Sequence, residues 1–253
     1  MSNKNQDEKH QAFIEHLGEL RKRLIWSIVS ILIGFLFCWV FSDILFDIVR
    51  RPIAPYLKSI TGGLVFTAPM DKFLAHIKVS FWGGAVVACP FWMYQAWKFV
   101  APGLYAEERK YTVSFIGFGT ILFLAGVSCV YFVVYPVAFK FLMTFGGEID
   151  SPMITIGEYL SFFITTTLAF GLAFETPVIL AILGMMGVIS SDFLVNYRRY
   201  AYVLLAAMSA IVTPPDVFSM LFMMALMVML YELSVILVKV LSQKADKLSH
   251  LNG

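Results

Sequence analysis

The chain has 253 residues, of which 59% are hydrophobic and 14% are charged, and its formal net charge at pH 7 is +2. Soluble domains average roughly 45–50% apolar and about 25% charged residues, so a water-soluble globule could not cover this much apolar surface with so few charges. The composition argues against a soluble enzyme, a nucleic-acid-binding protein, a disordered chain and a disulfide scaffold, and it predicts a protein of the lipid bilayer.

The N-terminal segment 1–23 predicts an amphipathic helix ahead of the first membrane span. Phe13, Leu17, Leu20 and Leu24 recur at intervals of four, three and four residues, which is one stripe of a helix. We expect this lead-in to lie at the cytoplasmic membrane surface before the chain turns into the span. The first dozen residues are polar and contain no short apolar core followed by a small-residue cleavage site, so we expect no removable signal peptide.

Two acids, Glu15 and Glu19, lie four residues apart on another face of this lead-in. Carboxylates at a basic membrane boundary could accept arginines from a partner, because a guanidinium matches a carboxylate in a two-bond fork. The plainer alternative is that Glu19 pairs with Arg23 at i, i+4 and only supports the helix, which is worth about 0.2–0.5 kcal/mol. The spacing alone leaves both interpretations open.

Six segments predict membrane-spanning helices, each of which needs about 20 mostly apolar residues to cross roughly 30 Å of hydrocarbon. The fifth segment has about 14 residues and would rise only about 21 Å. We favour a true span over a re-entrant segment there, because Pro214, Pro215 and Asp216 predict a tight extracytoplasmic turn after it. The predicted spans are about 24–42, 77–97, 111–137, 159–186, 200–213 and 217–236.

The distribution of Lys and Arg predicts that both termini are cytoplasmic. Thirteen of these 19 residues fall in segments that would then lie inside, against five in segments that would lie outside. The longest outer segment, 43–76, contains three prolines and two adjacent glycines, so we expect an extracytoplasmic cap with short helices. Since no internal repeat is visible, residues 1–253 are expected to form a single all-α membrane domain.

A second acidic pair, Glu107 and Glu108, follows a Pro-Gly break between the second and third predicted spans. Acids in the first turn of a helix are ordinary partners of the helix dipole, which is the simpler interpretation. The alternative is a second acidic site on the membrane face that also carries Glu15 and Glu19. Two such patches on one face would suit a ligand with adjacent arginines.

Glu175 lies inside the fourth predicted span, two residues before Pro177. A carboxylate in hydrocarbon costs at least about 2.5–3.5 kcal/mol on insertion scales, so the default interpretation is functional: the side chain faces a polar cavity or a partner. The alternative is that it satisfies backbone groups freed by Pro177. Asp216 is expected to cap the start of the sixth span.

Motifs of enzymatic chemistry are missing from the sequence. There is no H-E-x-x-H, no G-x-S-x-G and no phosphate-binding loop, and the four histidines are scattered. The cysteines Cys38, Cys89 and Cys129 lie in apolar runs without the spacing of metal ligands, so we expect small buried side chains. We expect neither an enzyme nor a bound metal or cofactor.

Four segments, in order along the chain, carry a resemblance to a known family: 13–24 (FIEHLGELRKRL), 97–109, 170–177 and 213–216. Together they resemble the TatC family, the polytopic subunit of the twin-arginine protein translocase, over nearly the whole chain. The resemblance implies six transmembrane helices in a cupped, TatC-like arrangement with a lipid-facing groove. It also implies a multi-pass protein of a bacterial inner membrane with both termini in the cytoplasm.

The resemblance further implies a receptor for signal peptides with two consecutive arginines on folded cargo, in a complex driven by the proton-motive force. In the family, the second acid of the N-terminal motif and the acid after Pro-x-Leu-Tyr form the recognition site. These are Glu19 and Glu108 here. Arg21 lies in the same N-terminal motif, and Glu15 and Glu107 are the neighbouring acids that we include in the site.

The intramembrane acid of the family corresponds to Glu175, next to Pro177, where TatA- and TatB-like single-span partners are expected to dock. Further expected partners are the lipid bilayer and other copies of this chain, but no nucleic acid. The runner-up hypothesis is a proton-coupled secondary transporter of small solutes that uses Glu175. A transporter would not need Glu19 and Glu108 to bind a peptide, whereas a receptor would.

Overall fold

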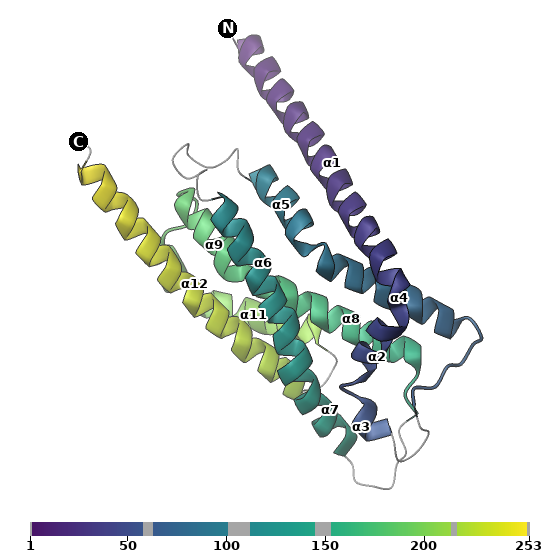
Figure 1. The fold of residues 1–253 in the computed structure, drawn as a ribbon. Coiled ribbons are helices and arrows are strands. Elements are labelled where there is room, and N and C mark those ends of the chain that lie inside the picture. The colour runs from purple at the N-terminus through teal and green to yellow at the C-terminus, as the bar shows by residue number, and fades with distance from the viewer. Residues whose placement is uncertain (1, 58–62, 101–111, 145–152, 214–216, 252–253) are drawn as a thin grey trace.

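A computed structural model of the chain shows an all-α architecture (Figure 1). The structure describes residues 2–57, 63–100, 112–144, 153–213 and 217–251. Within these ranges the regular structure is helical, apart from one isolated parallel bridge between Val65 and Thr155. The start of α1 and the end of α12 lie at the same end of the molecule, and these two helices form its opposite edges (Figure 1).

The lead-in and the first span form one helix, α1 (Ser2–Val40). The expected turn between them is absent, because no proline interrupts this stretch and a lone glycine such as Gly18 does not end a helix. In the most apolar stretch of α1, within Leu17–Val40, only 11% of the residues are buried. This helix therefore exposes apolar side chains on most of its surface.

The second predicted span is a bent pair of helices, α4 (Asp71–Val87) and α5 (Cys89–Val100), which meet at 57° around Ala88. Pro90 lies in the first turn of α5. It has no backbone N–H to continue the hydrogen bonds of α4, so the helix restarts in a new direction there. The sequence did not predict this bend.

Two further apolar segments are each interrupted once. The helices α6 (Thr112–Cys129) and α7 (Tyr135–Thr144) are joined by a π-helical turn, η3 (Val130–Val134), so this segment continues beyond its predicted end at 137. The helices α8 (Ile156–Ala173) and α9 (Thr176–Met185) are separated by a break at Phe174 and Glu175. Pro177 lies in the first turn of α9.

Four segments of the described chain are long and apolar enough to cross a membrane, or five if α4 and α5 form one broken span. The four are Leu17–Val40, Ser114–Thr144, Ile156–Met185 and Met220–Val240. The fifth predicted span corresponds to α11 (Arg198–Val212), whose 15 residues rise about 22 Å, less than the hydrocarbon thickness. A sixth crossing through α11 stays a prediction. The last helix, α12 (Val217–Leu251), continues well past residue 236.

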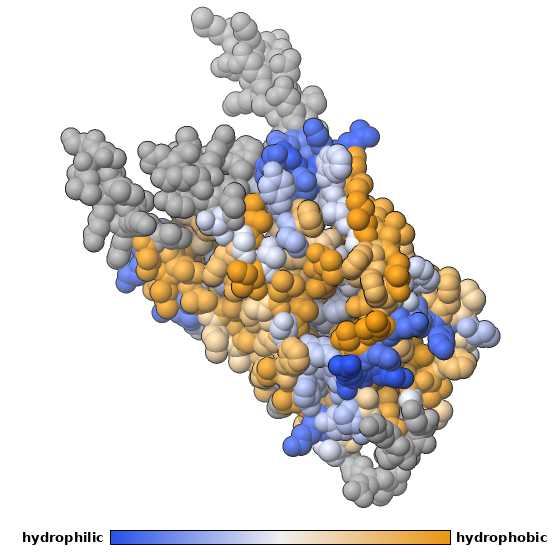
Figure 2. All heavy atoms as spheres, viewed as in Figure 1, coloured by the Kyte–Doolittle hydropathy of each residue, from blue (hydrophilic) through white to orange (hydrophobic). Residues whose placement is uncertain are grey.

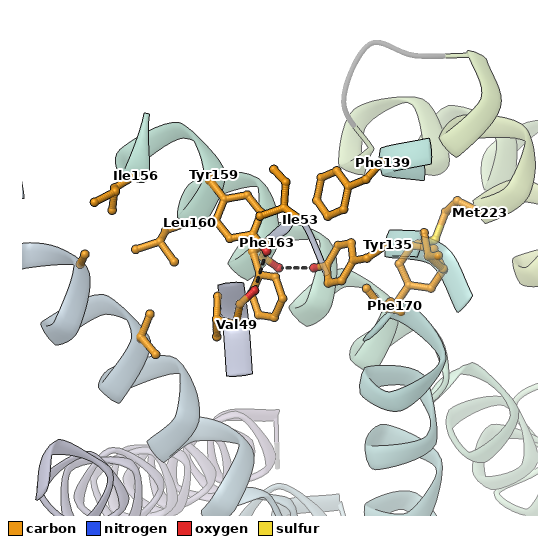
Figure 3. Packing of buried hydrophobic residues seen from close by; sticks show 14 of the residues in the cluster. Val49, Ile53, Tyr135, Phe139, Ile156, Tyr159, Leu160, Phe163, Phe170 and Met223 are labelled. Carbon is orange, nitrogen blue, oxygen red and sulfur yellow. Dashed lines mark hydrogen bonds between the residues drawn. The ribbon is translucent and has the colours of Figure 1, made fainter. Parts of the chain in front are cut away.

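Segment 43–76 contains α2 (Ser42–Arg50) and α3 (Ala54–Leu57), and hydrogen bonds from two tyrosines tie α2 to the longer helices. The Tyr159 hydroxyl of α8 donates to the carbonyl of Val49, and the Tyr131 hydroxyl of η3 donates to that of Ile48 at 2.8 Å. Figure 3 shows the cluster of buried side chains where these segments meet. A short helix, α10 (Ser191–Asn196), precedes α11.

The surface is strongly apolar. Figure 2 shows hydrophobic side chains over most of one face, with hydrophilic side chains gathered mainly toward its ends. Large apolar side chains are exposed on helices far apart in the sequence, including Val40, Phe132 and Ile211. Such exposure suits contact with lipid tails, whereas water would penalise it.

The helices α1 and α4 cross with their backbones in contact at two glycines. A Cβ added at Gly34 would lie 2.5 Å from the carbonyl oxygen of Gly84, and one added at Gly84 would lie 2.4 Å from the amide nitrogen of Phe35. Small residues at a crossing are a common way for membrane helices to associate, because they let two backbones approach closely.

We predict that Gly84→Ala lowers the stability of the protein by about 1–3 kcal/mol, since the new methyl group collides with the backbone of α1. The measurement is the midpoint of thermal unfolding of the purified protein in detergent. The matched control is Gly117→Ala on α6, where a Cβ meets nothing within 4 Å. An unchanged midpoint for Gly84→Ala would contradict the close approach of α1 and α4.

Candidate functional site

The acidic motif of α1 lies beside α5. The Glu19 Oε1 atom accepts a hydrogen bond of 2.9 Å from the Nη2 of Arg23, one turn later on the same helix. The Nη1 of Arg23 donates to the Oε1 of Gln95 on α5 at 3.3 Å. Arg23 thereby joins Glu19 to α5 through Gln95, which lies 72 positions after Arg23 in the sequence.

Glu19 thus forms the local ion pair that was the plainer of the two sequence interpretations. The carboxylate stays accessible in this ion pair, because the Glu19 side chain is 33% exposed and the Arg23 side chain is 18% exposed. Within the described residues, Arg23 is the one partner of this carboxylate, and the ion pair uses one of its two oxygens. A guanidinium that binds in the two-bond fork uses both oxygens, so it would compete with Arg23 for Oε1.

The other predicted residues of this site are only partly described. Arg21 is exposed on α1 and takes no part in the contact between Glu19, Arg23 and Gln95. Glu15 belongs to α1, one turn before Glu19, but its side chain lies outside the description. Glu107 and Glu108, the other two acids of the predicted site, lie outside the described ranges. Pro214 and Asp216, which belong to the predicted extracytoplasmic turn, also lie outside them.

Glu175 lies at the break between α8 and α9, and it is only 7% exposed. Its carboxylate packs on α6, where a Cβ added at Gly119 would come 3.0 Å from the Oε2 atom. The same added Cβ would lie 3.5 Å from the Cε of Met93 on α5. The buried Oε1 atom has no hydrogen-bond partner among the described residues.

The sequence interpretation expected Glu175 to face a groove or a partner. The structure encloses the carboxylate among α5, α6 and α9, and Pro177 beside it is also buried. Nearby lies an apolar cluster of buried residues: Cys89, Met93, Trp97, Phe123, Val178 and Ile182. The acid therefore offers little surface to a partner in this arrangement of the helices.

Two polar contacts between helices were not predicted. Arg198 at the start of α11 forms an ion pair of 2.6 Å with Glu232 of α12, which also accepts a hydrogen bond from Tyr202. In the sequence, Arg198 contributes only to the count of Lys and Arg that predicts the orientation, and no pattern links it to Glu232, 34 positions later. The role of Gln95 was also missed, and the one available signal was an amide in an otherwise apolar stretch.

In the described part of the chain, no group of three or more His, Cys, Asp or Glu side chains is placed to hold a metal ion. What the site offers is a partly exposed carboxylate that binds a guanidinium at the junction of α1 and α5. Together with several long apolar helices and a lipid-compatible surface, this defines a polytopic all-α membrane protein with a polar site between two helices.

Comparisons with known proteins identify the family. Residues 15–225 match the family described as Sec-independent protein translocase protein (TatC). The chain is 38% identical over 239 residues to the TatC protein of Carboxydothermus hydrogenoformans, covering 94% of this chain and 97% of that protein. It is 40% identical over 225 residues to the TatC protein of Campylobacter jejuni, covering 88% and 92%.

Solved structures agree with the sequence relatives. A crystal structure described as the twin arginine translocase receptor TatC superimposes with a TM-score of 0.78 at 34% identity, covering 89% of this chain and 98% of that one. A second, in the detergent DDM, gives a TM-score of 0.79 at the same identity. The chain therefore belongs to the TatC family.

The family assignment confirms the resemblance and the all-α membrane fold that were predicted from the sequence. It makes the chain a component of a protein translocase rather than an enzyme. The alternative of a proton-coupled transporter finds no support in these relatives, which are all translocase proteins.

We predict that Glu175→Leu leaves the thermal midpoint of the protein unchanged or raises it, because an apolar side chain replaces a buried carboxyl group with an unpartnered oxygen. Val178→Ala, in the neighbouring apolar cluster, is the control and should lower stability by about 2 kcal/mol. The measurement is thermal unfolding in detergent. A marked loss of stability in Glu175→Leu would mean that the carboxyl group supports the fold.

Proposed function

We propose that this chain is the receptor subunit of a twin-arginine translocase, and that Glu19 and Glu108 bind the paired arginines of the signal peptide on folded cargo. The observation that carries the proposal is the contact of Glu19 with a guanidinium at 2.9 Å while a third of its side chain stays exposed. The carboxylate thus has the geometry and the access that an arginine ligand needs. The solved relatives described as twin arginine translocase receptors support the same function.

The position of α5 supports the pairing of Glu19 with Glu108. Gln95, which holds Arg23, lies five residues before α5 ends at Val100. Glu108 follows that end by eight residues, and eight residues of extended chain reach at most about 28 Å. The segment with Glu107 and Glu108 is thereby tethered to the helix that contacts the Glu19 site.

We propose that this site faces the cytoplasm of a bacterial inner membrane, with both termini inside and six crossings. The start of α1 and the end of α12 lie at the same end of the molecule, which supports a common side of the membrane for both termini (Figure 1). The excess of Lys and Arg in those segments favours the cytoplasm as that side. Glu15 and Arg21 of α1 would then flank the site.

After recognition, the apolar stretch of the signal peptide would lie along lipid-exposed helices. The apolar part of α1 starts at Leu17, close to Glu19, and few of its residues are buried, so it offers such a surface directly next to the site. We propose that TatA- and TatB-like single-span subunits and further copies of this chain complete the complex, with the proton-motive force as its energy source. Glu175 and Pro177 are the proposed intramembrane contact with the single-span subunits, and because both are buried, this contact requires the surrounding helices to move apart.

We predict that Glu19→Ala or Glu108→Ala abolishes crosslinking to an Arg-Arg signal peptide, while the protein stays inserted in the membrane. Each change removes a carboxylate that accepts charge-assisted hydrogen bonds from the peptide. The measurement is photo-crosslinking with a labelled peptide, and Glu158→Ala, an exposed acid in the first turn of α8, is the control. Unchanged crosslinking in both variants would refute this site.

We predict that Glu175→Gln weakens association with the single-span partners more than it weakens recognition of the signal peptide. The carboxyl group of Glu175 is buried among α5, α6 and α9, whereas that of Glu19 on α1 is partly exposed. The two readouts are co-purification with tagged partner subunits and crosslinking to the signal peptide. An equal loss in both would contradict the division of roles between Glu19 and Glu175.

A further inference from the structure

We infer that Arg23 is an internal competitor for the Glu19 site: a resident guanidinium that an incoming arginine has to displace from Glu19 before it binds there. This inference rests on the proposed function of Glu19 and adds a regulatory contact to it. The observation behind it is that the chain supplies, from one turn away, the same chemical group that the proposed ligand carries.

Arg23 is held against Glu19 from two sides. One terminal nitrogen bonds Glu19 at 2.9 Å and the other bonds Gln95 of α5 at 3.3 Å. Because the guanidinium is planar, these two bonds fix its orientation and not only its position. Gln95 therefore makes Arg23 a preorganised competitor, since less conformational freedom is lost when it pairs with Glu19.

Arg23 is also incompletely satisfied in this position. Its Nε atom is buried and has no hydrogen-bond partner among the described residues, although a guanidinium has five donors. A buried donor without a partner is costly, and movement toward water would relieve that cost. The contact is thus strong enough to occupy Glu19 and weak enough to be exchanged for the guanidinium of a ligand.

The consequence for binding follows from simple competition. Every ligand that uses Glu19 must displace the same Arg23, so the apparent dissociation constant of each ligand is raised by the same factor. For a partly exposed ion pair this factor is roughly two- to five-fold. Arg23 would therefore keep weakly binding basic peptides off the receptor, without changing the ratio of affinities for Arg-Arg and Lys-Lys peptides.

The test is the binding of fluorescent Arg-Arg and Lys-Lys signal peptides to the full chain in lipid nanodiscs, measured by fluorescence anisotropy. We expect Arg23→Gln to tighten the binding of both peptides by the same two- to five-fold factor. Arg23→Lys keeps the charge but loses the planar guanidinium that bonds Glu19 and Gln95 at the same time. This variant should therefore tighten binding by a smaller amount than Arg23→Gln. A gain in affinity is a result that damage to the fold would not produce.

The matched control is Lys22→Gln, which removes an equal charge from the neighbouring exposed position of α1. It measures the long-range effect of lost charge, which salt screens, and should change binding less than two-fold. In a Glu19→Gln background, Arg23→Gln should give no tightening, because the competed carboxylate is gone.

The outcomes separate the inference from the proposed function. The receptor function stands if the natural chain binds the Arg-Arg peptide and Glu19→Gln weakens that binding. The internal competitor is refuted if Arg23→Gln then weakens binding, or changes the affinity no more than Lys22→Gln does. If the natural chain does not bind the Arg-Arg peptide, or Glu19→Gln leaves binding unchanged, the proposed site fails and the inference fails with it.

Discussion

Helices in a bilayer gain little from packing apolar side chains together, because the lipid tails around them are equally apolar. Their association depends instead on close backbone approach and on a few polar contacts. In this protein, α1 crosses α4 at Gly34 and Gly84 and is joined to α5 through Arg23 and Gln95. These contacts fix α1 in place while most of its apolar surface stays exposed to lipid. They also bring Glu19 to the side of α1 that faces α5.

Glu19 and Glu175, two of the acids singled out from the sequence, occupy opposite environments. Glu19 has a partner and is one-third exposed, so its carboxylate can exchange one guanidinium for another. Glu175 is almost fully buried, and one of its oxygens has no hydrogen-bond partner in the described chain. The first environment suits recognition of a soluble ligand at the membrane surface. The second suits a contact that forms only when α5, α6 and α9 move relative to one another.

Local sequence patterns predicted the features that are decided within one helix or one short motif. Apolar length identified the long helices, and the four motifs identified the TatC family. The spacing of Glu19 and Arg23 predicted their ion pair as one of two alternatives, since an i, i+4 pair is decided within one helix. The lead-in was predicted to turn before the first span, and this was wrong because nothing in residues 2–40 breaks the helix.

Contacts between distant segments were beyond sequence reasoning. The bend at Ala88 could have been suspected from Pro90, but its 57° angle depends on what α4 and α5 pack against. The bond from Arg23 to Gln95 and the ion pair of Arg198 with Glu232 join residues 72 and 34 positions apart. Periodicity carries no information about such pairs, because they arise only when the helices come together.

We propose that a carboxylate on α1 and one in the segment after α5 select a pair of guanidinium groups. The most direct measurement is co-purification of the full-length chain with a folded cargo whose signal carries either Arg-Arg or Lys-Lys. A lysine keeps the charge but cannot form the two-bond fork with a carboxylate. We predict that the Arg-Arg cargo is retained and the Lys-Lys cargo is lost. Equal retention of both cargoes would contradict recognition of a guanidinium pair.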